Sequence, residues 1–99
     1  MLEIEIHEDA ENEFKAAATF YEEREPGLGL SFLQRLRQAF DAIVDQPHAG
    51  TIVVNDIRRR LLRQFPYSVV YRVEDQRIFV LAVAHWSRRP GYWKKREKQ

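Results

Sequence analysis

The stretch from His85 to Trp93 combines side chains that transfer protons, bind anions and stack on rings. Its residues of interest are His85, Trp86, Arg88, Arg89, Tyr92 and Trp93. Cleaving RNA without a metal requires a base for the 2′-hydroxyl, cations for the phosphorane and an acid for the leaving oxygen, roles that His, Arg and Tyr can fill. The aromatic rings can stack on bases. The segment is a candidate site, with His85 and Tyr92 as catalytic residues only if the protein is a nuclease.

Structural roles for the same side chains stay open. His85 can be a strand-end histidine bonded to the backbone, and Trp86 and Trp93 can pack the tail onto a sheet.

A second basic group comprises Arg58, Arg59, Arg60 and Arg63. Successive side chains of a strand point to opposite faces, so we expect Arg58 and Arg60 on one face and Arg59 and Arg63 on the other. Guanidinium groups suit phosphate contacts, although arginines also keep a sheet soluble or pair with acids. Together with Arg88, Arg89, Trp86 and Trp93 they form the predicted nucleic-acid or target-binding set.

Several classes of chemistry have no counterpart in the sequence. Without cysteine there is no disulfide framework, thiolate zinc site or thiol nucleophile. No carboxylate pair, HExxH sequence, glycine-rich phosphate loop or Ser-His-Asp arrangement is recognisable. We therefore expect no metal and no cofactor. If the protein is an enzyme, it is a metal-independent endoribonuclease.

Charge is distributed unevenly along the chain. Residues 1–47 carry eleven acidic and four basic side chains, a net of −7, whereas residues 48–99 carry twelve basic and four acidic ones, a net of +8. The positive electrostatic potential of the second half attracts a polyanion or an acidic protein segment to one face of the domain. The beginning of the chain lacks the pattern of a signal peptide, and no apolar run approaches membrane-spanning length, so we expect a cytoplasmic protein without membrane contact.

Hydropathy periods predict the elements that would hold these residues. Alternation predicts a strand over 2–7 and a hairpin over 67–73 and 78–84, while Ile57 to Phe65 is the weakest strand candidate. Helical spacing predicts one helix over 9–24, capped by Asp9, and a second starting after Ser31. The stripes of the two helices are Ala10, Phe14, Ala17 and Tyr21, and Leu33, Leu36, Phe40 and Ile43.

The resulting order is β-α-α-β-β-β, an α+β fold in which a two-helix hairpin packs on one face of a small, mainly antiparallel sheet. We expect residues 1–99 to form one domain, with an exposed basic tail from about residue 88 to 99.

The element order, the arginine-rich strand, the segment Phe65 to Val73, and Ala82-Val83-Ala84-His85 leading to the tail together resemble the RelE/ParE toxins. These are toxins of type II toxin-antitoxin systems, also called plasmid stabilisation proteins. The resemblance covers nearly the whole chain. It implies a growth inhibitor neutralised by a cognate antitoxin, and a target that is either DNA gyrase or the ribosome with its messenger RNA.

Residues that depart from the endonuclease branch place the chain closer to the ParE-like branch. In the endonucleases the resemblance would give a second-strand role to Arg59 and a tail role to Tyr92. However, Ser68, Leu61 and Trp86 stand where basic residues are expected. The resemblance therefore slightly favours gyrase inhibition. A ribosome-dependent mRNA endonuclease (an mRNA interferase) and an inactive member that only binds antitoxin remain the alternatives.

Overall fold

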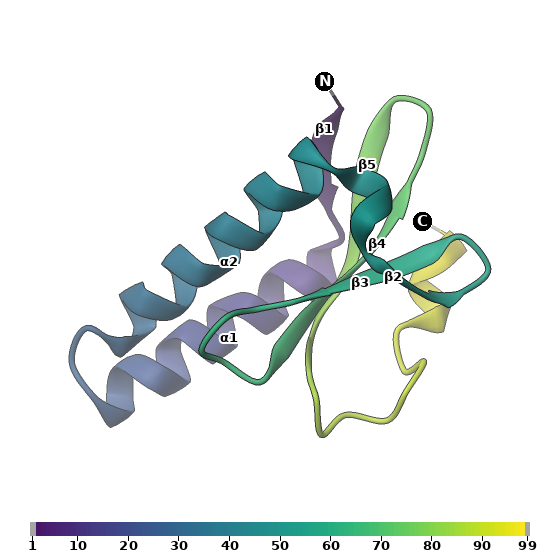
Figure 1. Cartoon of the computed structure of the whole chain (residues 1–99). Coiled ribbons are helices and arrows are strands. Elements are labelled where there is room, and N and C mark those ends of the chain that lie inside the picture. The colour runs from purple at the N-terminus through teal and green to yellow at the C-terminus, as the bar shows by residue number, and fades with distance from the viewer. Residues whose placement is uncertain (1, 99) are drawn as a thin grey trace.

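The computed structural model describes residues 2–98, which form two helices, five strands and two short 3₁₀ turns (Figure 1). In chain order they are β1 (Glu3–Ile6), α1 (Glu8–Arg24), α2 (Leu28–Asp45), a turn (Pro47–Ala49), β2 (Thr51–Val54), β3 (Ile57–Leu61), β4 (Tyr67–Val73), β5 (Arg77–His85) and a final turn (Lys94–Lys98). Neither helix within residues 2–98 has the length and apolar character needed to cross a membrane.

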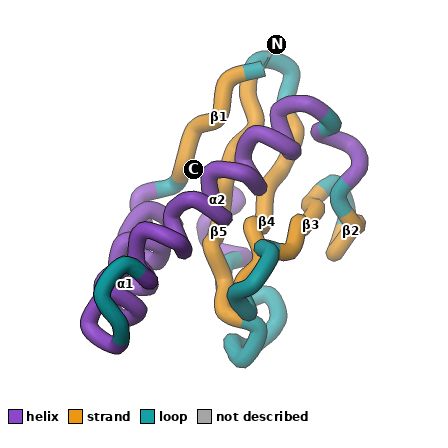
Figure 2. The backbone as a smooth tube through the Cα atoms, turned by 60° about the vertical axis from the view of Figure 1, so that its left-hand side comes forward, coloured by secondary structure: helices purple, strands orange, loops and turns teal. Residues whose placement is uncertain are grey.

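The strands form one mixed sheet in the order β1-β5-β4-β3-β2. β1 runs parallel to β5, and every other neighbouring pair is antiparallel. The α1–α2 hairpin covers one face, and the chain after β5 returns across the other (Figures 1 and 2). The predicted fold class is therefore confirmed, with one strand, β2, that the sequence analysis did not anticipate.

Apolar side chains fill both faces of the sheet. Between helices and sheet, Phe32, Ile43, Tyr71 and Val80 are fully buried. On the opposite face, Trp93 is only 4% exposed and packs into a smaller cluster with side chains of β3, β4 and β5. The expectation of an exposed tail is thus wrong in part. Burial of the Trp93 indole against this apolar face is more favourable in free energy than its exposure to water.

Two helix boundaries differ from the sequence-based expectation for physical reasons. His7, not Asp9, caps α1, its Nδ1 accepting a bond from the Asp9 amide at 2.9 Å. α2 begins at Leu28 rather than after Ser31, because the Glu22 carboxylate of α1 accepts bonds from the amides of Gly27 and Gly29. This cap comes from the other helix, so no local sequence signal announces it.

Two further expectations also need correction. β3 ends at Leu61, so Arg63 lies beyond the strand instead of sharing a strand face with Arg59. Of the predicted stripe on α2, Leu36 and Ile43 are buried, whereas Leu33 is 39% exposed.

Candidate functional site

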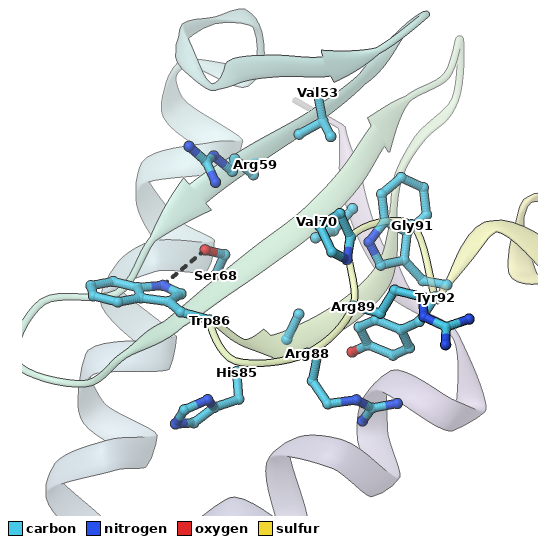
Figure 3. A pocket seen from close by; sticks show the side chains of 13 residues that line it. Val53, Arg59, Ser68, Val70, His85, Trp86, Arg88, Arg89, Gly91 and Tyr92 are labelled. Atoms are coloured by element: carbon cyan, nitrogen blue, oxygen red, sulfur yellow. Dashed lines mark hydrogen bonds between the residues drawn. The ribbon is translucent and has the colours of Figure 1, made fainter.

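A pocket of about 170 Å³ opens on the sheet face opposite the helices, and we call it the sheet-face pocket (Figure 3). β2 to β5 supply its floor and one wall, and the loop after β5 supplies the rest. Its lining residues are Val53, Arg59, Ser68, Val70, Ala84, His85, Trp86, Arg88, Arg89, Pro90, Gly91, Tyr92 and Trp93.

Trp86 is held at the mouth of this pocket by two hydrogen bonds. Its amide donates to the Pro66 carbonyl at 2.9 Å, and its indole Nε1 donates to Ser68 Oγ at 3.2 Å, the bond drawn in Figure 3. The side chain is nevertheless 56% exposed. An indole fixed in place and left largely in water can contact a partner with little loss of conformational freedom.

Arg59, Arg88 and Arg89 give the pocket its positive charge. Across residues 2–98, none of the three has a carboxylate within ion-pair distance. The Arg88 guanidinium lies 3.9 Å from the centre of the Tyr92 ring, a cation–π contact that leaves its charge unneutralised. The pocket therefore favours an anionic partner with apolar or aromatic side chains.

The Tyr92 hydroxyl is bound to a carboxylate rather than facing the pocket as a free proton donor. It donates to Glu13 Oε2 at 2.6 Å. Burial, together with the hydrogen bond and charge of Glu13, raises the pKa of Tyr92 well above its ordinary value of 10.0. A phenol with a raised pKa that already donates to a carboxylate is poorly placed to protonate a leaving oxygen.

The His85 ring is directed toward Tyr67, and the residue borders two cavities that Arg88 also lines. It packs edge-to-face on Tyr67 with ring centres 5.0 Å apart, and Tyr67 in turn contacts Tyr21 of α1. Nδ1 accepts the Ser87 amide at 3.0 Å, which assigns the proton of a neutral ring to Nε2. This tautomer has no free basic nitrogen, so His85 is poorly arranged as a general base.

The family described as "ParE toxin of type II toxin-antitoxin system, parDE" matches residues 4–90, most of the chain. The chain belongs to the ParE toxin family. This confirms the resemblance and its ParE-like branch.

A solved structure supports the same fold. The "Chromosomal ParDE TA system from P. aeruginosa" is similar with a TM-score of 0.74 and 21% identity, covering 86% of this chain and 96% of that chain. The search of curated proteins gave no match.

In this ParE-family chain, the predicted site residues separate into three groups. Arg59, Trp86, Arg88 and Arg89 meet at the sheet-face pocket. Arg60 and Arg63 line a different, smaller cavity with Arg35 of α2.

The remaining residues of the predicted set have structural contacts. Arg58 Nη1 donates to the carbonyls of His48 and Gly50, each at 2.9 Å, and so holds the chain that enters β2. Trp93 contributes its buried ring to the sheet-side cluster, while His85 faces Tyr67 on the helix side.

Glu13, which connects α1, β5 and the tail, was not predicted from the sequence. Its carboxylate accepts bonds from the Val83 amide at 3.0 Å and Arg96 Nη1 at 3.0 Å in addition to the Tyr92 hydroxyl. A signal was present: Glu13 lies three residues after Ala10 and four before Ala17, so it shares their buried stripe. A charged residue on such a stripe predicts a partner in the core.

Proposed function

We propose that this chain is the growth-inhibiting component of a type II toxin-antitoxin pair and that it acts by binding and inhibiting DNA gyrase. It would act in the bacterial cytoplasm, where gyrase is found, and a cognate antitoxin would neutralise it. The ParE toxin family of the chain supports this class of function.

One observation favours binding over catalysis: the two side chains able to perform acid–base chemistry are already engaged. Tyr92 donates to Glu13, and the Nδ1 of His85 accepts the Ser87 amide. By contrast, Arg59, Arg89 and Trp86 are exposed and lack acidic partners within residues 2–98. Exposed arginine and tryptophan are the residue types that most often anchor protein interfaces.

The proposed target surface is therefore the sheet-face pocket with its loop from Trp86 to Tyr92. Its charge and its exposed indole complement an acidic protein patch with apolar or aromatic contacts.

Induction of the chain alone in growing bacteria tests this proposal. Gyrase inhibition predicts growth arrest with accumulating DNA breaks and intact messenger RNA. The mRNA interferase alternative predicts cleaved messenger RNA and intact DNA. An inactive antitoxin-binding member predicts neither lesion and normal growth.

A further inference from the structure

Ser68 is a polar residue at a buried position on β4. It is 4% exposed, and within residues 2–98 it is the one non-aromatic polar side chain that is buried. Strand interiors favour β-branched and aromatic residues such as Val69, Val70 and Tyr71, which follow it. Burying a hydroxyl is unfavourable unless the hydroxyl forms a hydrogen bond. The serine therefore indicates a contact that the apolar residues of this strand cannot make.

That contact is a hydrogen bond to an exposed tryptophan. Trp86 Nε1 donates to Ser68 Oγ at 3.2 Å, and Figure 3 shows the two side chains directed toward each other. Trp86 is 56% exposed, so without the serine its N–H would bond to water and the fold would lose little stability. The bond instead restricts the two side-chain torsions of the indole. Together with the bond from the Trp86 amide to the Pro66 carbonyl, it fixes where the ring lies.

Two exposed side chains of β3 lie next to this pair. Leu61 is the register partner of Ser68, so both side chains lie on the same face of the sheet, and Leu61 is 52% exposed. Arg59 lines the sheet-face pocket with Ser68 and Trp86, and it has no acidic partner within residues 2–98. This part of the surface thus offers an aliphatic side chain, a ring of fixed orientation and a free guanidinium.

We propose that Ser68 is a positioning residue of the proposed target surface: its hydroxyl holds the Trp86 indole in the orientation that the target contacts, with Leu61 as the adjacent apolar contact. The partner in this contact is the target of the proposed function, on which the assignment rests. The matching surface of that partner presents an apolar side chain to the ring and to Leu61, and a carboxylate to Arg59.

The size of the expected effect follows from the entropy of the indole. Immobilising a side chain on binding weakens affinity by about two- to tenfold, the equivalent of about 0.5–1.5 kcal/mol. In the wild-type chain Ser68 has already immobilised the ring, whereas in Ser68→Ala this loss occurs on binding. Deleting the whole ring removes its contacts as well, so Trp86→Ala should weaken binding by about thirtyfold or more.

The first measurement follows the two indole N–H signals of the purified full chain by ¹⁵N NMR relaxation. In the wild-type chain the Trp86 indole should be as ordered as the buried Trp93 indole, with an order parameter near about 0.85. In Ser68→Ala the value for Trp86 should fall below about 0.6, and that for Trp93 should not change. The control is Ser31→Ala, the same substitution on α2, where the hydroxyl donates to the Gly27 carbonyl.

The second measurement is the amount of protein per cell that halves the growth rate, determined by immunoblot after graded induction. Ser68→Ala should require about two- to tenfold more protein than wild type, and Ser31→Ala the wild-type amount. Trp86→Phe keeps an aromatic ring but removes the N–H donor, so it should lose at least as much potency as Ser68→Ala. The double variant should be no weaker than Trp86→Phe alone, because the serine acts through the indole. Thermal melting checks that every variant folds.

Three results would overturn the assignment of Ser68. They are an ordered Trp86 indole in Ser68→Ala, wild-type potency of that variant, and losses that add up in the double variant. A wild-type chain that does not slow growth is a different result, since it refutes the proposed function itself. Growth arrest with fully active gyrase refutes only gyrase as the target, because neither measurement depends on which target the chain binds.

Discussion

At the scale of single residues, Glu13 is the carboxylate that fixes the tail to the rest of the molecule. It is 17% exposed and accepts bonds from three partners on β5 and the tail, one of which is Arg96, itself only 15% exposed. Removing it leaves the Val83 amide without its acceptor and leaves Arg96 with only the Leu81 carbonyl and the longer contact to Asp9, which costs more than the original bonds contributed.

Glu13→Ala should therefore lower the free energy of unfolding by about 3 kcal/mol. Urea denaturation measures this, with Glu11→Ala as the control because Glu11 is half exposed on the same helix and pairs only with Lys15. The control should lose less than about 0.5 kcal/mol. Equal losses in the two variants would show that Glu13 does not anchor the tail.

The Tyr92 hydroxyl gives a second prediction at this scale. Tyr92→Phe removes one donor from Glu13 but leaves Arg96 and the Val83 amide in place, so stability should fall by only about 1 kcal/mol. Growth inhibition at equal expression should persist, since the hydroxyl faces Glu13. Loss of toxicity from a well-folded Tyr92→Phe protein would instead assign the phenol a chemical role and support the nuclease alternative.

The two tryptophans differ in burial and should differ in effect. Trp93 is 4% exposed, so Trp93→Ala should cost about 3–5 kcal/mol of stability, whereas Trp86→Ala should cost less than about 1 kcal/mol. Trp86→Ala should still weaken growth inhibition, because the exposed indole belongs to the proposed target surface. Acrylamide quenching checks the premise: only the Trp86 emission should be readily quenched. A fully toxic Trp86→Ala protein would remove this residue from the surface.

At the scale of elements, a network of charged side chains links the β4–β5 turn to β1. Glu74 accepts bonds from Arg72 at 2.7 Å and from Arg77, which also binds Glu5 on β1. The bond from Arg77, supported by Arg72, holds the pKa of Glu74 below its ordinary value of 4.5 despite partial burial. A carboxyl with a lowered folded-state pKa stabilises the fold above the unfolded-state pKa, and this contribution is lost as pH falls through the folded-state value.

In Glu74→Gln, the free energy of unfolding should consequently fall less steeply than in wild type as pH drops below about 4.5. At neutral pH the substitution should lower the free energy of unfolding by less than about 1 kcal/mol. Urea unfolding midpoints between neutral pH and about pH 3 measure the effect. Glu23→Gln, at an exposed position on α1, serves as the control and should keep the wild-type pH profile. A wild-type profile for Glu74→Gln would mean that this turn contributes nothing to acid unfolding.

The elements that the sequence predicts well are those with a strong period. Ala10 and Ala17 mark α1, and the continuous apolar run over β5 marks a strand buried on both faces. β2 was missed because Ile52 and Val53 are both about half exposed, so the strand shows no alternation of buried and exposed positions. The run of β-branched residues before the Asn55-Asp56 turn was the available signal.

The candidate site was only partly predictable because strand alternation alone does not reveal what lies opposite each face. It correctly separates Arg59 from Arg60. It could not place Arg63, which depends on where β3 ends, or bring Arg35 from α2 beside them. The contact between Glu13 and the tail joins residues 79 positions apart, and such pairs leave little trace in one sequence.

At the scale of the whole molecule, the basic second half is not neutralised evenly by the acidic first half. Arg77 and Arg96 pair with acids of β1 and α1. By contrast, the arginines of the sheet-face pocket, and Arg60 and Arg63 at the smaller cavity beside α2, have no acidic partner within residues 2–98. Part of the unneutralised charge thus lies at two separate places on the surface. Binding of the proposed target at the sheet-face pocket should therefore weaken as salt rises.

The most direct test of the central claim is a supercoiling assay with purified DNA gyrase and the purified chain. We predict that the wild-type chain inhibits gyrase. For the double variant Arg59→Gln with Arg89→Gln, the protein concentration that gives the same inhibition should be at least about thirtyfold higher. Arg37→Gln, which removes an exposed charge far from the pocket, should inhibit like wild type. Gyrase that stays active at every concentration of the wild-type chain, or a double variant as potent as wild type, would contradict the account.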